Sequence, residues 1–340
     1  MRQLRTEEQI IAGWRKDTAN PVISISCATY NHEKYIGDAL DGFLAQETEY
    51  RFEIIVHDDA STDRTAEIVR DYEGRYPRLI KAVYQSENQY SKGKSPSQFI
   101  GPLRTGTYIA TCEGDDYWTH PQKLQKQVRY METNPECSMS FHAALRVNAD
   151  RHKVGQVRPY RRDTVVPIDD IIRGGGGFIA SNSRVMRREY ALNRPQAFSK
   201  APVGDFPTQV YMATKGQVYY FADRMAAYRV LVEGSWTERY HNDPRLKEQM
   251  LTGMIETIDE MDQYTQGAHS ASFQYARGIR KLELRLLKHG FKAHRDRESR
   301  SFYRALPLAM KLRFYAKYGL RSGIDHYFRV VRQARRRRRR

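Results

Sequence analysis

The chain carries, at residues 106–116, the stretch Gly-Thr-Tyr-Ile-Ala-Thr-Cys-Glu-Gly-Asp-Asp, in which an apolar run ends in acidic residues. A second apolar run, at residues 52–57, ends in Asp58 and Asp59. Carboxylates at the end of a buried strand cost free energy unless another group pairs with them. Two such ends in one chain therefore predict a shared site for a cation and a phosphate-bearing ligand.

Around these two runs, predicted strands alternate with predicted helices. The strands are 22–27, 52–57, 79–84, 108–112 and 139–147, and the helices between them begin near Ile36, Ser61 and Pro121. This alternation is typical of an α/β fold with a largely parallel sheet covered by helices on both faces. Because ligands bind outside the carboxyl ends of such strands, both acidic ends would lie at the binding edge.

Glycine-rich phosphate-binding motifs are absent from the sequence. Neither G-x-G-x-x-G nor G-x-x-x-x-G-K-[ST] occurs. A bound diphosphate would therefore be held in another way, and a metal ion between carboxylates and phosphate is the natural substitute, because carboxylates alone would repel it.

The second half of the chain alternates less regularly. Four glycines at 174–177 could form a mobile lid or a plain connector. We predict a helix from Gly204 to Ala213, strands at 218–221 and 225–232, and helices over 244–290, where methionines recur at helical spacing.

Composition favours one large domain with appendages. The chain has 340 residues, of which 40% are hydrophobic, and no apolar run approaches the roughly 20 residues that span a bilayer. The three cysteines are widely spaced, which favours reduced thiols in a cytosolic protein over disulfides or a zinc site. We divide the chain into an N-terminal helical segment (1–20), a main domain (21–240), a helical segment (241–291) and a basic tail (292–340).

The positive charge is concentrated in that tail. Of a net charge of +17, residues 292–340 carry +14, and the chain ends in six arginines, Arg335–Arg340, preceded by Arg332. Basic residues among the apolar residues of 306–321 suit a helix on an anionic membrane surface. Nucleic-acid binding and disorder are the alternatives, of which nucleic acid is the least favoured. We expect a cytoplasmic protein, peripheral on the inner membrane face.

Three motifs together resemble the family 2 glycosyltransferases. They are Val-Ile-Ser-Ile-Ser-Cys-Ala-Thr-Tyr-Asn-His at 22–32, Ile-Val-His-Asp-Asp-Ala-Ser-Thr-Asp at 55–63, and Cys-Glu-Gly-Asp-Asp-Tyr-Trp at 112–118. The resemblance covers about residues 20–240. It implies a GT-A fold, Rossmann-like with a mostly parallel sheet, followed here by a helical and basic extension. It also implies a nucleotide-diphospho-sugar donor, most simply a UDP-sugar, with Mg²⁺ or Mn²⁺ and inversion at the anomeric carbon.

The resemblance also assigns roles to motif residues. Asp115 and Asp116 would face the metal, Glu113 the ribose, and Asp59 the base. The nucleoside pocket would be lined by Thr29, Tyr30 and Asn31. The alternatives are local: residues 29–31 suit an ordinary turn, and Asp59 and Asp63 suit helix-entry caps. His57 is more simply a histidine at a strand end than a ligand.

The family also places an acidic general base at a loop-to-helix junction, which Asp205 matches; its alternative role is to cap that helix. Arg229 would contact phosphate or form a structural ion pair. The family often has a metal-binding histidine where this chain has Leu231. That ligand is therefore absent here or is replaced by Glu233 or His241. Trp236 would stack on the acceptor sugar or be buried.

The predicted activity is metal-dependent transfer of a sugar to a hydroxyl acceptor in the synthesis of a surface or lipid-linked glycan. Two alternatives remain from the residues alone. One is a basic nucleic-acid-binding protein on an α/β scaffold. The other is a catalytically inactive homologue that only binds a nucleotide.

Overall fold

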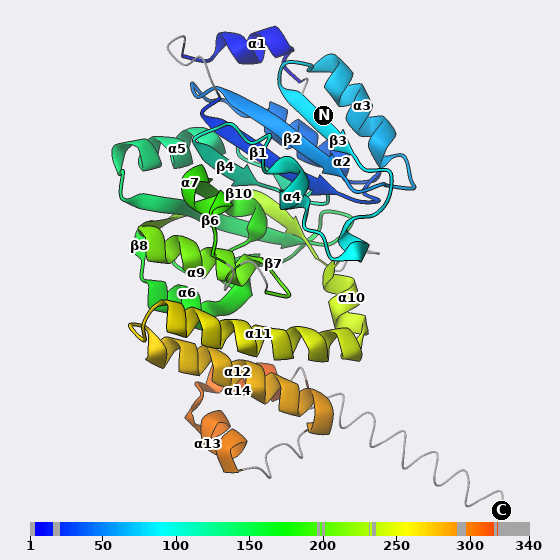
Figure 1. The fold of residues 1–340 in the computed structure, drawn as a ribbon. Helices are drawn as coiled ribbons and strands as arrows, with labels where there is room; N and C mark the ends of the chain where they lie inside the picture. The colour runs from blue at the N-terminus through cyan, green and yellow to red at the C-terminus, as the bar shows by residue number, and fades with distance from the viewer. Residues whose placement is uncertain are drawn as a thin grey trace, which may run out of the picture. The chain divides into compact units, whose positions relative to one another are not determined.

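The computed structural model describes residues 4–15, 21–195, 198, 201–230, 232, 236–290, 297–315 and 318. Its contacts divide the chain into two compact units, which are described one at a time (Figure 1). The first unit comprises residues 1–199 and 204–239, and the second comprises residues 200–203 and 240–340.

The N-terminal half of the first unit has the predicted parallel arrangement. Four strands, β1 (Ile23–Thr29), β2 (Phe52–Asp58), β3 (Ile80–Tyr84) and β4 (Tyr108–Thr111), lie in the order β3-β2-β1-β4, and all three pairings are parallel. The connecting helices include α2 (Ile36–Leu44) and α3 (Thr65–Arg75), and the N-terminal helix is α1 (Glu7–Ala12). Parallel strands bring their carboxyl ends to one edge, so the ends of β1, β2 and β4 meet there.

Beyond β4 the sheet is mixed rather than mostly parallel. The short strand β9 (Val185–Arg187) lies antiparallel between β4 and β6 (Cys137–Val147), and β10 (Gln217–Arg229) runs parallel to β6. Three further antiparallel strands, β5 (Tyr117–Trp118), β7 (Lys153–Val157) and β8 (Thr164–Val166), complete the ten-stranded sheet. The two strands predicted at 218–221 and 225–232 form one strand, β10. It is interrupted by register shifts between Phe221 and Ala226.

The remaining helices of the first unit are α4 (Pro96–Ile100), α5 (Lys123–Thr133), α6 (Ile168–Gly174), α7 (Arg188–Leu192) and α9 (Asp205–Lys215). Short 3₁₀ turns form at Tyr90–Lys92, Gly175–Gly177 and Ser181–Ser183, the first of them between β3 and α4. The glycine run ends α6. A Cβ at Gly174 would lie 2.3 Å from the Phe178 ring, so close packing excludes a larger residue there.

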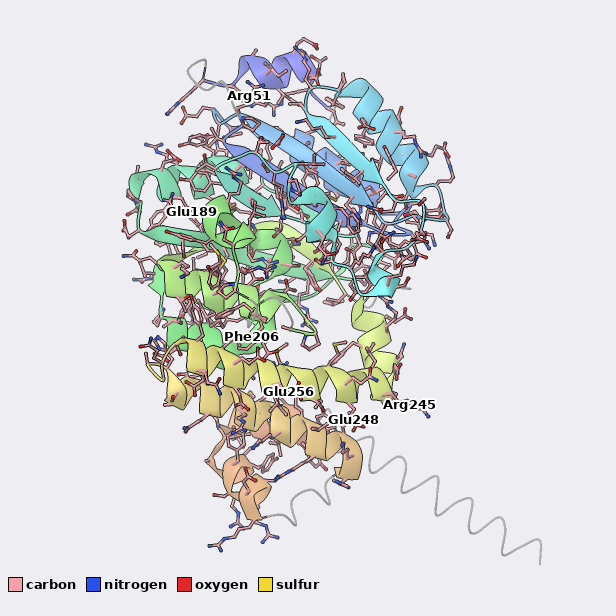
Figure 2. The ribbon with its side chains drawn as sticks, viewed as in Figure 1. Arg51, Glu189, Phe206, Arg245, Glu248 and Glu256 are labelled. Atoms are coloured by element: carbon pink, nitrogen blue, oxygen red, sulfur yellow. The ribbon has the colours of Figure 1, made fainter. Side chains whose placement is uncertain are left out.

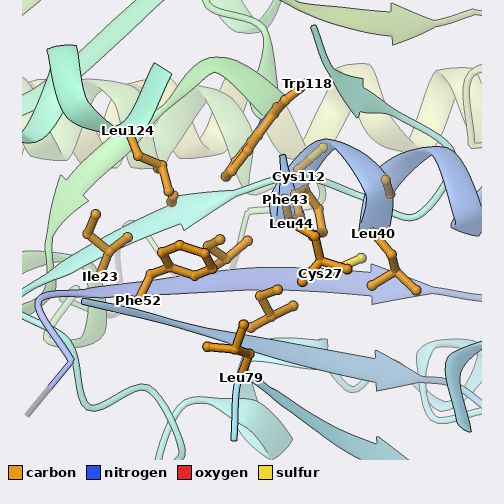
Figure 3. Packing of buried hydrophobic residues seen from close by; sticks show 14 of the residues in the cluster. Ile23, Cys27, Leu40, Phe43, Leu44, Phe52, Leu79, Cys112, Trp118 and Leu124 are labelled. Atoms are coloured by element: carbon orange, nitrogen blue, oxygen red, sulfur yellow. The ribbon is translucent and has the colours of Figure 1, made fainter. Parts of the chain in front are cut away.

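The core of the first unit joins the strands to α2, α3 and α5. Figure 3 shows Ile23, Phe43, Phe52 and Leu124 meeting in one cluster that also contains Cys27 and Cys112. Each such buried apolar side chain contributes roughly 1.5–3 kcal/mol. All three cysteines are buried and free, which confirms the prediction that they form no disulfide.

The second unit is helical. It contains α11 (Pro244–Tyr264), α12 (Ser270–His289), α13 (Arg297–Ala305) and α14 (Leu308–Phe314), and α10 (Trp236–Asn242) crosses the boundary between the units. The predicted helical spacing is confirmed in α11, where Met254, Ile258 and Met261 are buried. Among the described residues, the helices are all too short or too polar to cross a membrane.

One buried charge in the first unit leads to a stability prediction. Lys123 begins α5 and is fully buried, with its Nζ 4.1 Å from the centroid of the Trp118 ring. This Nζ has no hydrogen-bond partner among the described residues. Burial lowers the pKa of Lys123 from 10.5 to about 7. Between these two pH values the unfolded chain binds more protons than the folded one, so stability rises with pH across this window.

We therefore expect Lys123→Met to stabilise the protein by a few kcal/mol at pH 6, because methionine fills the space, keeps an aromatic contact and needs no proton. The advantage should shrink as the pH approaches 10. Urea unfolding of both proteins at several pH values measures this difference. If the stability difference between Lys123→Met and the unmodified protein did not vary with pH, the lowered pKa of Lys123 would be contradicted.

Candidate active site at the strand ends

Three carboxylates gather directly after β4. Oxygen atoms of Glu113, Asp115 and Asp116 lie within 4.8 Å of one another. Two backbone hydrogen bonds fix this loop against β1: Cys112 N donates to Ser26 O at 3.1 Å, and Gly114 N donates to Ala28 O at 2.9 Å. The glycine is required, because a Cβ at position 114 would lie 2.6 Å from the Thr29 hydroxyl oxygen.

The carboxylates destabilise one another's ionised forms. Asp116 is 1% exposed, and burial together with the charges of Asp115 and Glu113 raises its pKa well above the usual range, opposed by Arg229. The surrounding protein atoms, and then the charges of Asp115 and Asp205, raise the pKa of Glu113 to about 8, although part of its surface is open to solvent. Like charges this close need a proton or a cation between them.

The donor set fits a hard divalent cation. Asp116 Oδ1 accepts a hydrogen bond from Arg229 N at 2.7 Å, whereas its Oδ2 is buried and has no partner among the described residues. An orphaned carboxylate oxygen beside two further carboxylates is the ligand type that Mg²⁺ and Mn²⁺ take. The structure thus brings Glu113, predicted to face the ribose, into the same cluster as the predicted metal ligands Asp115 and Asp116.

Arg229 lies behind this cluster and supports it. Its side chain is 1% exposed; Nη1 donates to Asp115 O at 2.6 Å, and Nη2 pairs with the carboxylate of Asp38. The guanidinium also lies over the rings of Tyr35 and Tyr117, 4.7 and 4.6 Å from their centroids. Two roles were predicted for Arg229, a contact with phosphate and a structural ion pair. These contacts are those of a structural ion pair.

We expect Arg229→Met to destabilise the first unit by about 3–5 kcal/mol, because Asp38, only 18% exposed, loses its buried partner, and the backbone carbonyl of Asp115 loses a donor. Arg151 supplies a matched control, since its Nη2 pairs with the same carboxylate at 2.5 Å while its side chain is 59% exposed. Arg151→Met should cost about 1 kcal/mol or less. Denaturant unfolding compares the two, and equal losses would show that burial of the pair does not matter.

The second acidic end joins the first through β1. Asp59 is buried next to the end of β1, where its N–H donates to Thr29 O at 3.0 Å. Its carboxylate accepts from the N–H groups of Gln89 and Tyr90 at 2.8 and 3.0 Å, which fixes the loop after β3. Gly114, within the other acidic end, also packs against Thr29, so the two strand ends converge as predicted. The proposed contact of Asp59 with a base stays a prediction.

The loop after β1 combines a turn with an exposed aromatic side chain. Asn31 has a φ of 55°, and its Oδ1 accepts from Thr62 N at 2.8 Å, as expected of a turn residue. Tyr30 is 41% exposed and available to a ligand. Asp63 accepts from Thr65 N at 2.9 Å at the entry of α3, its predicted alternative role. His57 is buried and stacks on Phe99.

The predicted general base begins a helix. Asp205 is the first residue of α9, next to Phe206, which Figure 2 labels. Its Oδ1 lies 2.9 Å from Nη2 of Arg184, and its side chain is 40% exposed. Its charge contributes to the raised pKa of Glu113.

The sequence did not single out Arg184 or Asp38. Neither belongs to a motif, and Asp38 is 191 residues from its partner Arg229, so no local pattern could reveal the pair. The predicted residues Leu231 and Glu233, and the side chains of Trp236 and His241, lie outside the described residues.

Comparisons with known proteins agree with this arrangement. The model of the family described as "Glycosyl transferase family 2" matches residues 24–192. An uncharacterised protein of Mycobacterium tuberculosis is 35% identical over 245 residues, which are 70% of this chain and 67% of that one.

Two solved structures share the fold at low identity. TarS of S. aureus in complex with UDP-GlcNAc has a TM-score of 0.56 and 18% identity, covering 87% of this chain and 79% of that one. The mannosyltransferase PcManGT of Pyrobaculum calidifontis in complex with GDP-Man and Mn²⁺ has a TM-score of 0.54 and 16% identity, covering 92% and 86%. The α/β fold with its curled mixed sheet is that of GT-A glycosyltransferases. The chain belongs to glycosyl transferase family 2 and is a glycosyltransferase.

Proposed function

We propose that this glycosyltransferase moves a sugar from a nucleotide-diphospho-sugar, most simply a UDP-sugar, to a hydroxyl acceptor, with Mg²⁺ or Mn²⁺ and with inversion. One observation carries the proposal. The loop after β4 and the loop after β2 both lie against Thr29 at the end of β1: Gly114 packs against its side chain, and the N–H of Asp59 donates to its carbonyl, so the two acidic loops adjoin one strand end. Two GT-A neighbours, TarS and PcManGT, were solved with a nucleotide-sugar, and the second also with Mn²⁺.

Each group would have a distinct task. Asp115 and Asp116, with Glu113 beside them, would hold the cation, which when bound neutralises the diphosphate as its bond to the sugar breaks. Tyr30, Asn31 and Thr29 would line the nucleoside pocket, with Asp59 beside them. Asp205 would take the proton of the acceptor hydroxyl as that oxygen attacks the anomeric carbon. Its partial exposure suits that task, since an acceptor hydroxyl could reach it.

A panel of nucleotides and nucleotide-sugars tests the donor. We expect UDP and one UDP-sugar to raise the melting temperature in the presence of Mn²⁺ and little in its absence, because a ligand that binds only the folded state stabilises it. Slow hydrolysis of that UDP-sugar should accompany binding. Stabilisation by a GDP-sugar instead would show that the nucleobase of the donor is guanine rather than uracil. Binding without turnover would indicate an inactive homologue. No stabilisation by any nucleotide would overturn the proposal.

We also propose that the second unit binds the inner face of an anionic membrane, where a lipid-linked or surface glycan would be the acceptor. Helix α14 buries Phe314 against α12 but leaves Leu308, Leu312 and Tyr315 exposed by 70%, 60% and 57%. Lys311 and Arg313 lie on the same short helix. Exposed apolar residues beside basic ones suit the boundary between lipid headgroups and acyl chains. The arginine run Arg335–Arg340, which was predicted to contribute to membrane binding, lies outside the described residues.

Vesicle binding by the full chain tests this surface. We expect the double variant Leu308→Glu, Leu312→Glu to weaken binding to vesicles containing phosphatidylglycerol by about tenfold or more, given the apolar area removed from the lipid. Val154→Glu is the matched control, because Val154 is also exposed, by 57%, but lies in the first unit. Flotation should separate the two, and an equal effect of both variants would contradict the proposal.

A further inference from the structure

Three buried or half-buried arginines of the first unit include the partner of the candidate base. Arg104 follows α4, Arg184 precedes β9, and Arg194 follows α7. Arg104 and Arg184 are each 6% exposed, and Arg194 is half-buried. The carboxylate paired with this group is that of Asp205, at 2.9 Å from Arg184 Nη2. Buried guanidinium groups without matching acids are costly, which indicates that something else neutralises them.

Two of these arginines have buried nitrogens that make no hydrogen bond within the described residues. Nε and Nη1 of Arg184 and Nε of Arg104 are buried and have no partner there. Arg194 is more accessible, and its Nη1 donates to the hydroxyl of Thr208 on α9. A guanidinium has five N–H donors in a planar fork that matches a carboxylate or a phosphate.

The three positive charges are close enough to affect one another. Burial lowers the pKa of Arg104 to about 10, and the charge of Arg194 adds to this decrease. Burial and the charge of Arg184 lower the pKa of Arg194, while Asp205 raises it. Arg184 pairs with Asp205 and Arg194 donates to Thr208, three residues further along α9, so these two arginines lie at the start of one helix. We call them, together with Arg104, the arginine cluster, of which Arg194 is the accessible member.

The strand order places the cluster on the acceptor side of the site. β1 lies on one side of β4, with the proposed nucleoside pocket at its end, and β9 lies on the other side. Arg184 stands at the start of β9, where its carbonyl accepts from Thr111 N, at the end of β4, at 3.3 Å. The cluster is therefore separated from the proposed nucleoside pocket by β4 and adjoins the carboxylate that would deprotonate the acceptor.

We propose that the arginine cluster binds an anionic group of the acceptor, a phosphate or a carboxylate, and so positions the neighbouring hydroxyl against Asp205. The identification of the anion as part of the acceptor rests on the proposed function. The binding of an anion by the arginine cluster does not. Arg194, the more accessible of the three, would meet the anion first, while Arg184 stays paired with Asp205 and adds its charge from behind. Arginine suits this task better than lysine, because its fork binds two oxygens at once.

Inorganic phosphate is the first probe, used without metal and at constant ionic strength. We expect phosphate to raise the melting temperature of the full chain more than chloride does, and Arg194→Gln to weaken phosphate binding about tenfold or more. Arg188→Gln is the matched control, because Arg188 is an exposed arginine at the start of α7, the helix that precedes Arg194. Arg194→Lys should restore part of the affinity, which a merely structural role would not predict.

The relation to the donor is the second readout. Phosphate and UDP with Mn²⁺ should stabilise the protein additively, because their sites lie on opposite sides of β4. Competition between them would place the anion at the donor diphosphate and overturn the acceptor assignment. An equal response to phosphate and chloride would overturn the anion site itself. If phosphate binds while no nucleotide does, the proposed function fails and the anion site stands.

Matched acceptors supply the third readout. An alkyl glucuronide differs from the alkyl glucoside only in its carboxylate. We expect kcat/KM for transfer to favour the anionic acceptor by about tenfold, the size of one charge-assisted hydrogen bond. The preference should disappear in Arg194→Gln and persist in Arg188→Gln. Equal rates for the two acceptors in the unmodified protein, or a preference that survives Arg194→Gln, would contradict the proposal.

Discussion

Replacing Asp115 by alanine is expected to lower the metal-dependent turnover of the nucleotide-sugar by about a thousandfold, which corresponds to about 4 kcal/mol of lost transition-state stabilisation. Asp115 is half-buried within the cluster of carboxylates after β4, where a cation would neutralise the leaving diphosphate. Its loss leaves Asp116, whose Oδ1 is already occupied by the Arg229 N–H, with too few ligands to hold the metal in place. Initial rates of UDP release at saturating Mn²⁺ measure the effect.

The variant should also lose the stabilisation that Mn²⁺ and UDP give together. Without ligands, its free energy of unfolding should stay nearly the same or increase. Removing one of three mutually repelling carboxylates relieves the repulsion that raises the pKa of Asp116. Asp223→Asn is the matched control, because Asp223 pairs with Lys126 on the surface. A variant at position 115 that keeps full metal-dependent turnover would remove the carboxylate cluster from the mechanism.

The parts of the fold that could be predicted are the strands that can be identified from their own local sequence pattern. β1, β2 and β4 are short apolar runs that end in polar residues, so both their type and their functional edge follow from local pattern. The parallel order of these strands then brings Asp59 and the carboxylates after β4 together.

The parts that could not be predicted depend on contacts between distant segments. β5 has two residues and β9 has three, which is too short to show a period of two, so the mixed character of the sheet was missed. The polar residues Asp223 and Arg224 divided β10 into two predicted strands, whereas the structure passes through them with a shift in register. In the same way, the pairing of Arg184 with Asp205 depends on β9 and α9, which only the folded chain brings together.

Replacing Asp205 by asparagine is expected to lower sugar transfer by about 10²–10⁴-fold, the range that a general base contributes. Asparagine has nearly the same shape and can still accept a hydrogen bond from Arg184, but it cannot take up the proton of an acceptor hydroxyl. Binding of the donor should therefore persist, because Asp205 starts α9 and lies outside the loops that would hold the nucleotide. Transfer rates at saturating acceptor, together with Mn²⁺-dependent stabilisation by UDP, separate the two effects.

The alternative role of Asp205, as the start of a helix, gives a different result. If the carboxylate served only the first turn of α9, asparagine would replace it at a cost of a few tenths of a kcal/mol and the rate would stay nearly unchanged. Thr214→Ala is the matched control on the same helix, because its hydroxyl donates to Tyr211 O at 2.7 Å and has no part in the proposed site. A loss of transfer in Asp205→Asn that exceeds the loss in Thr214→Ala by a hundredfold, at equal stability, would assign the proton transfer to Asp205. Equal losses in the two variants would leave only the fold of α9 to explain them.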